Sequence, residues 1–148
     1  MRGLPLSGKS TKAKQIIEES GYVGVSHSTN SFFMVNGVYR FSRYLLTEYH
    51  RRNQQNFFRS LKAEVPIVIC DNTNIELRDY EYYYKTAHQF GYEVAFEVLP
   101  VIRLAAFRMR NTIGIPEDTF ICMKRRFKKE CRVPEPYPEE ELESVSAS

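Results

Sequence analysis

The amino-acid sequence predicts an α/β fold, in which a parallel sheet carries helices on both of its faces. Apolar runs of strand length alternate along the chain with longer segments whose apolar residues recur at helical spacing. Strands that alternate with helices are joined by crossover connections and lie parallel to one another. The chain of 148 residues is long enough for one such domain, and 43% of its residues are hydrophobic.

The first half of the chain contains two predicted helices and two predicted strands. Residues 9–19 form an amphipathic helix that ends near Gly21, because glycine suits the left-handed backbone that follows a helix. Residues 22–26 form a short apolar strand. A long helix over residues 43–62 carries an apolar stripe, and the continuous apolar run at residues 65–70 predicts a strand buried on both faces.

The second half of the chain continues the alternation. Residues 77–90 predict a helix that is stopped by Gly91. Apolar and polar residues then alternate over residues 92–98, which is typical of a strand with one exposed face. Two further helices are expected at residues 102–111 and 117–129, and together they form a lid region over about residues 102–129.

Residues 3–10 match the phosphate-binding pattern G-x-x-x-x-G-K-S/T. In such a loop the glycines let backbone N–H groups curl around phosphate oxygens, the lysine neutralises the β- and γ-phosphates, and the hydroxyl holds Mg²⁺. The helix that follows favours the same anion at its N-terminus. A glycine-rich turn without a ligand is the alternative. The residues predicted to bind a nucleotide are Gly3, Pro5, Ser7, Gly8, Lys9, Ser10 and Thr11.

Two features of this loop depart from the usual pattern. Leu6 stands where most phosphate loops carry glycine, so either it adopts positive φ at a cost of about 1–2 kcal/mol or it shifts its N–H away from the phosphate. The loop also normally follows the central buried strand, and residues 1–2 are too short to form it. We therefore expect the first strand to be missing or truncated, with a hole in the sheet, because the chain begins upstream or is a fragment.

Three polar segments are predicted to meet at the carboxyl edge of the sheet, where ligands of α/β proteins bind. These are the phosphate loop, residues 28–31 and residues 71–74. Asp71 directly follows the predicted buried strand. Phosphate-loop proteins carry an acid at this place, and it holds Mg²⁺ directly or through water. Ser10 and Asp71 are thus the predicted metal ligands. The other interpretation of residues 71–74 is a helix N-cap with an Asx turn.

Arginines of the lid region are candidates for the cations that close over a γ-phosphate. Arg103 and Arg110 share a helix face that precedes Gly114, and Arg108 points elsewhere. Ordinary solvated arginines are the alternative. A basic run follows on the last predicted helix, and it is either a nucleic-acid contact or a solvated face: Lys124, Arg125, Arg126, Lys128 and Lys129.

The composition also bounds the domain and its surroundings. We expect one domain over residues 1–131 and a disordered acidic tail over residues 132–148, which hold one arginine and five glutamates and which either bind a protein partner or aid solubility. Cys70, Cys122 and Cys131 lack metal-ligand or disulfide spacing, so they are expected as reduced, mostly buried thiols. No apolar run is long enough to span a bilayer. The expected compartment is the cytoplasm, with the nucleus as second choice.

Taken together, these motifs resemble those of the phosphate-loop ATPases related to polynucleotide 5′-hydroxyl kinases. The resemblance covers nearly all of residues 2–129. Besides the phosphate loop it rests on these pieces, in order: Ser28-Thr29 with Phe32-Phe33, Gly37-x-Tyr39-x-Phe41, His50 with Asn53-Gln54, Asp71-Asn72-Thr73-Asn74, Gly91-Tyr92-x-Val94, and Arg110-Asn111 with Gly114-Ile115. It implies a P-loop NTPase fold of the kinase-like type and transfer of the ATP γ-phosphate, with Mg²⁺, to a hydroxyl such as a nucleic-acid 5′-OH.

The resemblance also assigns roles to residues. Lys9 contacts the phosphates, Ser10 and Asp71 lie at the metal, and Arg110 is a lid cation. At the position of Asn30 the family usually carries an aspartate, which resembles the general base that takes the proton of the substrate hydroxyl. The amide of asparagine cannot accept a proton at physiological pH. Since such a base contributes typically about 10²–10⁴-fold, turnover is expected to be weak. Three hypotheses follow: a weak polynucleotide-type kinase, a nucleotide-binding pseudo-kinase that acts through partners, and a non-catalytic nucleic-acid-binding module.

Overall fold

The computed structural model describes residues 1–131, so the predicted acidic tail at residues 132–148 lies outside the described part of the chain. The helices are α1 (Lys9–Glu19), α2 (Leu46–Lys62), α3 (Leu77–Gln89), α4 (Leu104–Arg110) and α5 (Glu117–Cys131), with the short 3₁₀ helices η1 (Thr29–Phe33) and η2 (Arg43–Leu45). The strands are β1 (Gly24–His27), β2 (Met34–Val35), β3 (Val38–Tyr39) and β4 (Ile67–Cys70). Each predicted helix is present. The first turn of the helix expected at residues 43–62 is the 3₁₀ helix η2.

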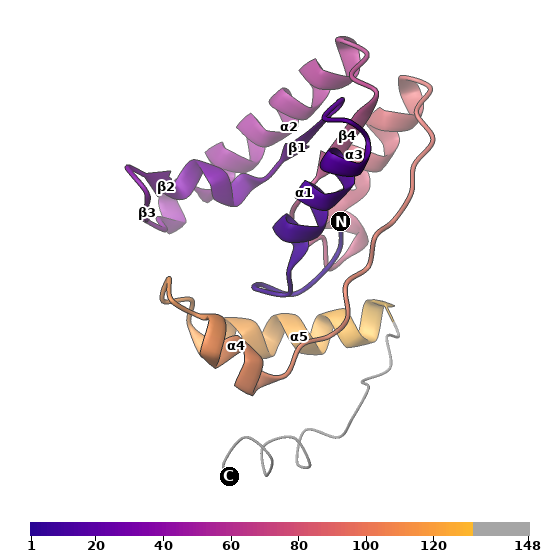
Figure 1. Cartoon of the computed structure of the whole chain (residues 1–148). Coiled ribbons are helices and arrows are strands. Elements are labelled where there is room, and N and C mark those ends of the chain that lie inside the picture. Colours follow the sequence, from indigo (N-terminus) through magenta and orange to yellow (C-terminus); the bar gives the residue numbers. More distant parts are fainter. Residues whose placement is uncertain (132–148) are drawn as a thin grey trace.

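A parallel pair of strands lies at the centre of the molecule. β1 and β4 pair in parallel from Gly24 beside Ile67 to His27 beside Cys70. In Figure 1, α1 lies in front of these strands, and α2 and α3 lie behind them. The structure is thus a mixed α/β fold with a parallel sheet and helices on both faces, as the sequence predicts.

The prediction of a strand at residues 92–98 is wrong. Residues 92–97 form no regular secondary structure, and Val98 forms an isolated parallel bridge with Arg2. Arg2 N–H donates to the Glu97 carbonyl at 2.7 Å, and Leu99 N–H donates to the Arg2 carbonyl at 2.8 Å. A strand requires a neighbour along its length, and among residues 1–131 Arg2 is the residue that pairs with this segment.

The expectation that the strand at residues 65–70 is buried on both faces is also wrong. Within β4 only Ile69 is buried, and Ile67, Val68 and Cys70 are half-buried. β1 covers one edge of β4, and no described strand pairs with the other edge. The half-buried residues of β4 thus follow from a parallel sheet that has two strands in the described part of the chain.

The segment between β1 and α2 contains a hairpin that the sequence analysis did not identify. β2 and β3 pair antiparallel around Asn36 and Gly37, whose φ angles are 51° and 78°. Positive φ at both residues is the geometry of a two-residue hairpin loop, and Asn-Gly is its strongest sequence signal. This dipeptide between apolar residues was the signal that would have predicted the hairpin.

Two separate apolar cores stabilise the described chain. One lies between α2, α3 and the sheet and contains the buried residues Phe57, Leu61, Tyr83 and Ala87. The other joins the phosphate loop to the lid helices α4 and α5, and its buried members are Leu4, Ile75, Val101, Phe107, Phe120 and Phe127. Because Leu4 belongs to both the loop and this second core, the lid helices pack directly against the predicted ligand site.

The surface departs from the sequence predictions at two places. Cys122 is exposed and Cys70 is half-buried, so the expectation of mostly buried thiols is not met by these two. Lys124 is buried although it belongs to the basic run of α5, whose other members are exposed. None of the described helices combines the length and the apolar composition needed to cross a bilayer.

Candidate phosphate-binding site

The phosphate loop begins with a tight turn that places Leu6 in the left-handed region. Ser7 N–H donates to the Leu4 carbonyl at 3.2 Å, and Leu6, the third residue of this turn, has φ of 61°. Proline is common at the second position of such a turn, where Pro5 stands, and a third residue with positive φ is normally glycine or asparagine. Leu6 therefore bears the strain that the sequence predicts, and the packing of its side chain against the Leu4 core offsets part of it.

Two glycines are required by the geometry of the loop. A Cβ atom on Gly3 would lie 2.7 Å from the Ser7 Oγ and 3.2 Å from the Leu99 Cβ, so only glycine allows this close approach. Gly8 has φ of 97° and is the N-cap of α1. Because Gly8 has no side chain to cap the helix, the first N–H groups of α1 remain available to an anion.

The loop also contains a buried hydroxyl without a partner. The Oγ of Ser7 is buried and has no hydrogen-bond partner among the described residues. The first turn of α1 carries no acidic residue that would repel a negative charge. Free donors at a helix N-terminus, together with this unused hydroxyl, fit a phosphate group at the loop.

The side chain of Lys9 turns back onto the loop. Its Nζ donates to the Leu4 carbonyl at 2.7 Å. Burial lowers the pKa of Lys9 to about 8, and the charge of Asp71 opposes part of this shift. The side chain is thus protonated at neutral pH, and its hydrogen-bond partner is a neutral carbonyl that a phosphate oxygen could replace.

Ser10 and Asp71 meet, as the sequence predicts for a metal site. The Ser10 Oγ donates to the Asp71 Oδ2 at 2.8 Å, and Asp71 is only 5% exposed. Mg²⁺ prefers one or two protein oxygens, several waters and substrate phosphates. Among residues 1–131 no group of three or more His, Cys, Asp or Glu side chains could hold a metal. The pair therefore fits Mg²⁺ that is shared with a nucleotide, rather than a metal held by protein alone.

Residues 71–74 connect three parts of the site. The Asn72 Oδ1 accepts from Thr29 N–H at 2.9 Å, which ties β4 to η1. The Asn74 Nδ2 donates to the Met1 carbonyl at 2.8 Å, and the Thr73 carbonyl accepts from Gly3 N–H at 3.0 Å. The three polar segments predicted at the carboxyl edge of the sheet are thus joined by hydrogen bonds.

The alternative interpretation of residues 71–74 as a helix N-cap is wrong. The following helix, α3, begins at Leu77 and has Glu76 as its N-cap, in a capping box with Asp79. The structure thereby separates the cap from the segment at residues 71–74, whose side chains bond to the loop and to η1 instead.

The lid brings one of its three candidate arginines to the loop. The Arg110 Nη1 donates to the Leu6 carbonyl at 2.9 Å. Arg108 instead pairs with Glu117 through two hydrogen bonds of 3.0 Å and 2.7 Å, and Arg103 is the exposed N-cap residue of α4. The expectation that Arg108 points elsewhere than Arg110 is confirmed, but the expectation that Arg103 and Arg110 share a helix face is wrong, because Arg103 precedes the helix in an extended conformation.

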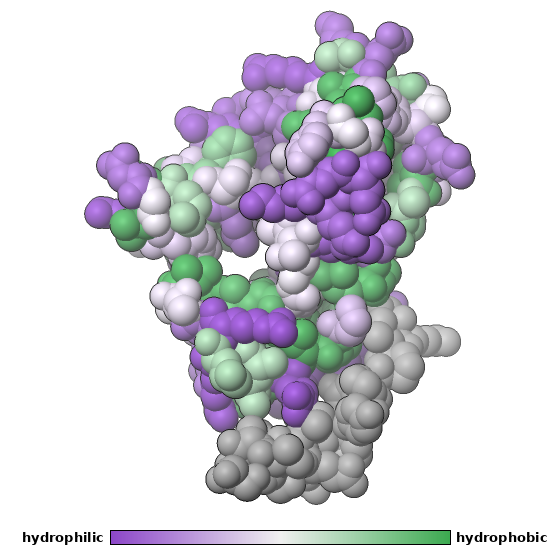
Figure 2. Space-filling model, in the orientation of Figure 1, coloured by the Kyte–Doolittle hydropathy of each residue, from purple (hydrophilic) through white to green (hydrophobic). Residues whose placement is uncertain are grey.

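Asn30 lies at the same edge of the sheet but is exposed to solvent. It follows Thr29, which is buried and fixed by Asn72 and by a contact of 3.2 Å between its Oγ1 and the His50 Nδ1. In the described chain no hydrogen bond joins Asn30 to Lys9. The surface is hollowed between the part that carries β2 and β3 and the part that carries α4 (Figure 2).

Arg2 is a structural residue of the site that the sequence analysis did not identify. Its Nε donates to the Asn74 carbonyl at 2.8 Å and its Nη2 to the Ile75 carbonyl at 2.7 Å. The guanidinium also lies over the Tyr80 ring, 4.7 Å from its centroid. No sequence pattern indicates these contacts, because they depend on where α3 and residues 74–75 lie in space.

Comparison with known proteins gives relatives of limited similarity. No family model matches the chain. The chain is 28% identical over 137 residues to human NEDD4-binding protein 2, and the match covers 90% of this chain and 8% of that protein. The chain is thus similar to a short part of a much longer human protein.

Proposed function

We propose that this chain binds ATP with Mg²⁺ at the phosphate loop and transfers the γ-phosphate to a hydroxyl, with a nucleic-acid 5′-hydroxyl as the acceptor. The observation that carries the proposal is the hydrogen bond between Ser10 and Asp71 beside the half-buried Lys9. A lysine, a hydroxyl and a carboxylate then lie together at an uncapped helix N-terminus. This set supports a P-loop NTPase fold of the kinase-like type.

In this proposal each group of the site has its own task. The N–H groups at the start of α1 donate to phosphate oxygens, and the Lys9 Nζ exchanges the Leu4 carbonyl for the β- and γ-phosphates. Ser10 and Asp71 are the residues that would hold Mg²⁺, which when bound neutralises charge on the phosphates. Arg110 already bonds to the Leu6 carbonyl, so it needs only a local change of partner to contact a γ-phosphate.

A polyanionic acceptor is supported by the exposed charges of α5. Arg125, Arg126, Lys128 and Lys129 are exposed on this helix. Such a basic face attracts a phosphate backbone without reading its sequence. A protein partner bound through residues 132–148 stays a prediction, because those residues lie outside the described part of the chain.

The first test is ATP binding by calorimetry, with and without Mg²⁺, on the wild type, Lys9→Ala and Lys14→Ala. Lys9→Ala is expected to weaken binding about 10–150-fold, because a charge-assisted hydrogen bond is worth about 1.5–3 kcal/mol. Lys14→Ala is the matched control, since Lys14 is exposed on the same helix and loses the same charge. If the wild type does not bind ATP, the loop has lost its ligand and the proposal fails.

ATP affinity is also expected to fall as the pH rises through about 8. Burial lowers the pKa of Lys9 to about 8 in the free protein, and a bound phosphate raises it again by favouring the ammonium. Binding above that pH therefore takes up a proton, so the affinity drops about tenfold for each further pH unit until the pKa of the complex is reached. Titrations between pH 7 and 9.5 in buffers of different ionisation enthalpy measure both the affinity and the proton uptake. An affinity that stays constant across this range would show that Lys9 does not contact the nucleotide.

A further inference from the structure

Two exposed aromatic rings, each preceded by an exposed arginine, follow the β2–β3 hairpin. Phe41 is 56% exposed and comes directly after Arg40, and Tyr44 is 94% exposed and comes directly after Arg43. The two arginine–aromatic pairs are three residues apart, between β3 and the start of α2. We call these four residues the hairpin platform.

The backbone that carries the platform is held in place. The Arg40 N–H donates to the Phe33 carbonyl at 2.8 Å, and the ring of Phe41 lies 5.0 Å from that of Phe33, which is only 1% exposed. Tyr44 belongs to η2, which leads directly into α2. The exposed rings therefore stand on ordered structure, which lowers the entropy that a ligand must overcome on binding.

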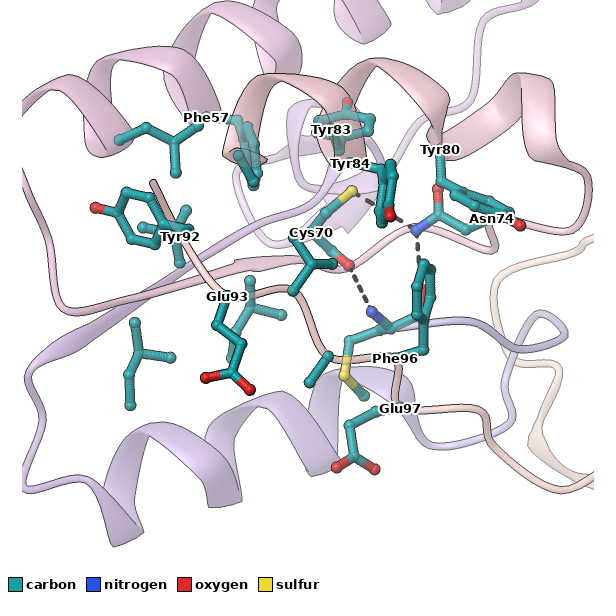
Figure 3. Close-up of a pocket in the computed structure, with 18 of the residues that line it drawn as sticks. Phe57, Cys70, Asn74, Tyr80, Tyr83, Tyr84, Tyr92, Glu93, Phe96 and Glu97 are labelled. Carbon is teal, nitrogen blue, oxygen red and sulfur yellow. Dashed lines mark hydrogen bonds between the residues drawn. The ribbon is translucent and has the colours of Figure 1, made fainter. Parts of the chain in front are cut away.

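Other aromatic side chains of the chain are used for internal packing. Around the pocket beside β4, for example, the ring of Tyr83 meets that of Phe57 edge-on, with centroids 4.9 Å apart (Figure 3). In the described chain the ring of Tyr44 has no such partner. Four apolar side chains near the platform are also between 42% and 52% exposed, and a group of this kind marks an interaction surface: Met34, Val35, Val38 and Leu45.

The platform is positively charged and lacks a partner for its charge. Within residues 1–131 the side chains of Arg40 and Arg43 form no hydrogen bond or ion pair. Residues 20–47 contain no aspartate or glutamate. The next acid along the chain, Glu48, accepts hydrogen bonds from two other arginines of α2. A ligand that matches the platform must therefore bring negative charges together with flat apolar groups.

The platform lies at the same edge of the sheet as the phosphate loop. It follows β1 and η1, so it continues the chain from the carboxyl end of the strand and from Asn30. Across a hollow of the surface lies α4, whose Arg110 bonds to the Leu6 carbonyl of the loop (Figure 2). A polymer bound on the platform is thus placed beside the candidate site rather than behind it.

We propose that the hairpin platform binds single-stranded nucleic acid, with bases stacked on Phe41 and Tyr44 and with phosphates against Arg40 and Arg43. Every base has a face that stacks on an aromatic ring, and in a single strand these faces are free, whereas in a duplex they stack on one another. An acidic peptide would match the arginines alone. That the bound strand is also the phosphate acceptor rests on the proposed function, but its binding to the platform requires no ATP.

The test measures the fluorescence anisotropy of a labelled, mixed-sequence single strand of about 12 nucleotides, without ATP. We expect saturable binding of this strand, and at least about 25-fold weaker binding of a strand of the same length that lacks its bases, because two stacked bases are lost while the charge is kept. A blunt duplex of the same sequence is expected to bind as weakly as the abasic strand. Equal binding of all three would show that charge alone holds the strand, and would overturn the proposal.

Variants of Tyr44 test the stacking. Tyr44→Ala is expected to weaken the single strand about 5–150-fold, the usual effect of removing one ring that stacks on a base, and Tyr44→Phe is expected to bind as the wild type does. Tyr22→Ala is the matched control, since Tyr22 is 74% exposed but precedes β1, at the opposite edge of the sheet. If Tyr44→Ala keeps the affinity of the wild type, or if it only dissolves a dimer of the chain, the proposal is overturned.

Variants of Arg43 test the phosphate contacts. Arg43→Ala is expected to reduce the slope of log affinity against log salt concentration by about 0.7, as the loss of one phosphate contact to a single strand does. Arg59→Ala is the control, because it removes the same charge from the far end of α2 and should leave the slope unchanged. A chain that binds the strand but not ATP contradicts the proposed function alone. A chain that binds ATP but not the strand overturns the present inference alone.

Discussion

Asn30→Asp is expected to raise the rate of phosphate transfer from ATP to a 5′-hydroxyl oligonucleotide by about 10²–10⁴-fold, the usual contribution of a general base. Asn30 is exposed at the carboxyl edge of the sheet, and its neighbour Thr29 is held by Asn72 and His50. The backbone that presents residue 30 is thus already fixed. A carboxylate there can accept the proton of an acceptor hydroxyl, which an amide cannot. Single-turnover transfer of labelled phosphate measures the gain.

Ser31→Asp is the matched control for this experiment. It adds the same charge one residue further along η1, but it also removes the hydrogen bond of 2.6 Å from the Ser31 Oγ to the Ser28 carbonyl. We expect no comparable gain, since a general base must lie within hydrogen-bond reach of the proton it takes. If Asn30→Asp binds ATP and still transfers no phosphate, the site lacks more than its base. The chain is then a pseudo-kinase rather than a weakened enzyme.

Phe120→Ala is expected to lower the free energy of unfolding by about 3–5 kcal/mol, as truncation of a buried phenylalanine does. Phe120 is 0% exposed, and its ring stacks on that of Phe107 with centroids 4.2 Å apart. The same core contains Leu4 of the phosphate loop. The cavity left by the ring is therefore expected to loosen the packing that holds the loop and Arg110 in place. Urea unfolding measures the stability, and we expect ATP to bind about tenfold more weakly, at a cost of about 1.4 kcal/mol.

Phe57→Ala separates the two effects, because Phe57 lies in the core between α2, α3 and the sheet. It is 4% exposed and is expected to lose a similar amount of stability while keeping its ATP affinity at temperatures well below melting. If Phe120→Ala does not fold, Phe120→Leu replaces it in the experiment. We then expect a smaller loss of both the free energy of unfolding and the ATP affinity. Equal effects of Phe57→Ala and Phe120→Ala on ATP affinity would contradict a special link between the lid core and the loop.

The relation between sequence and structure differs between the loop and the sheet. Residues 3–10 predict the start of a helix at Lys9 and a strained position at Leu6, because both depend on neighbouring residues, and the structure begins α1 at Lys9 and has φ of 61° at Leu6. The contacts within the site also depend on how distant segments are arranged in the sheet. In a parallel sheet the carboxyl ends of the strands lie at one edge, which is why the contact between Ser10 and Asp71 was predictable from two distant segments.

Local sequence determined the helices, the glycine-dependent turns of the phosphate loop and the residue types at the carboxyl edge of the sheet, since these follow from spacing, backbone freedom and strand direction. The tertiary structure alone decided which apolar segments pair. Residues 92–98 carry the pattern of a strand, yet residues 92–97 form no regular secondary structure, because a strand is defined by a neighbour that the pattern cannot supply. It also decided that Arg110 reaches the loop while Arg108 pairs with Glu117, since the direction of each side chain depends on how α4 packs against the core around Leu4.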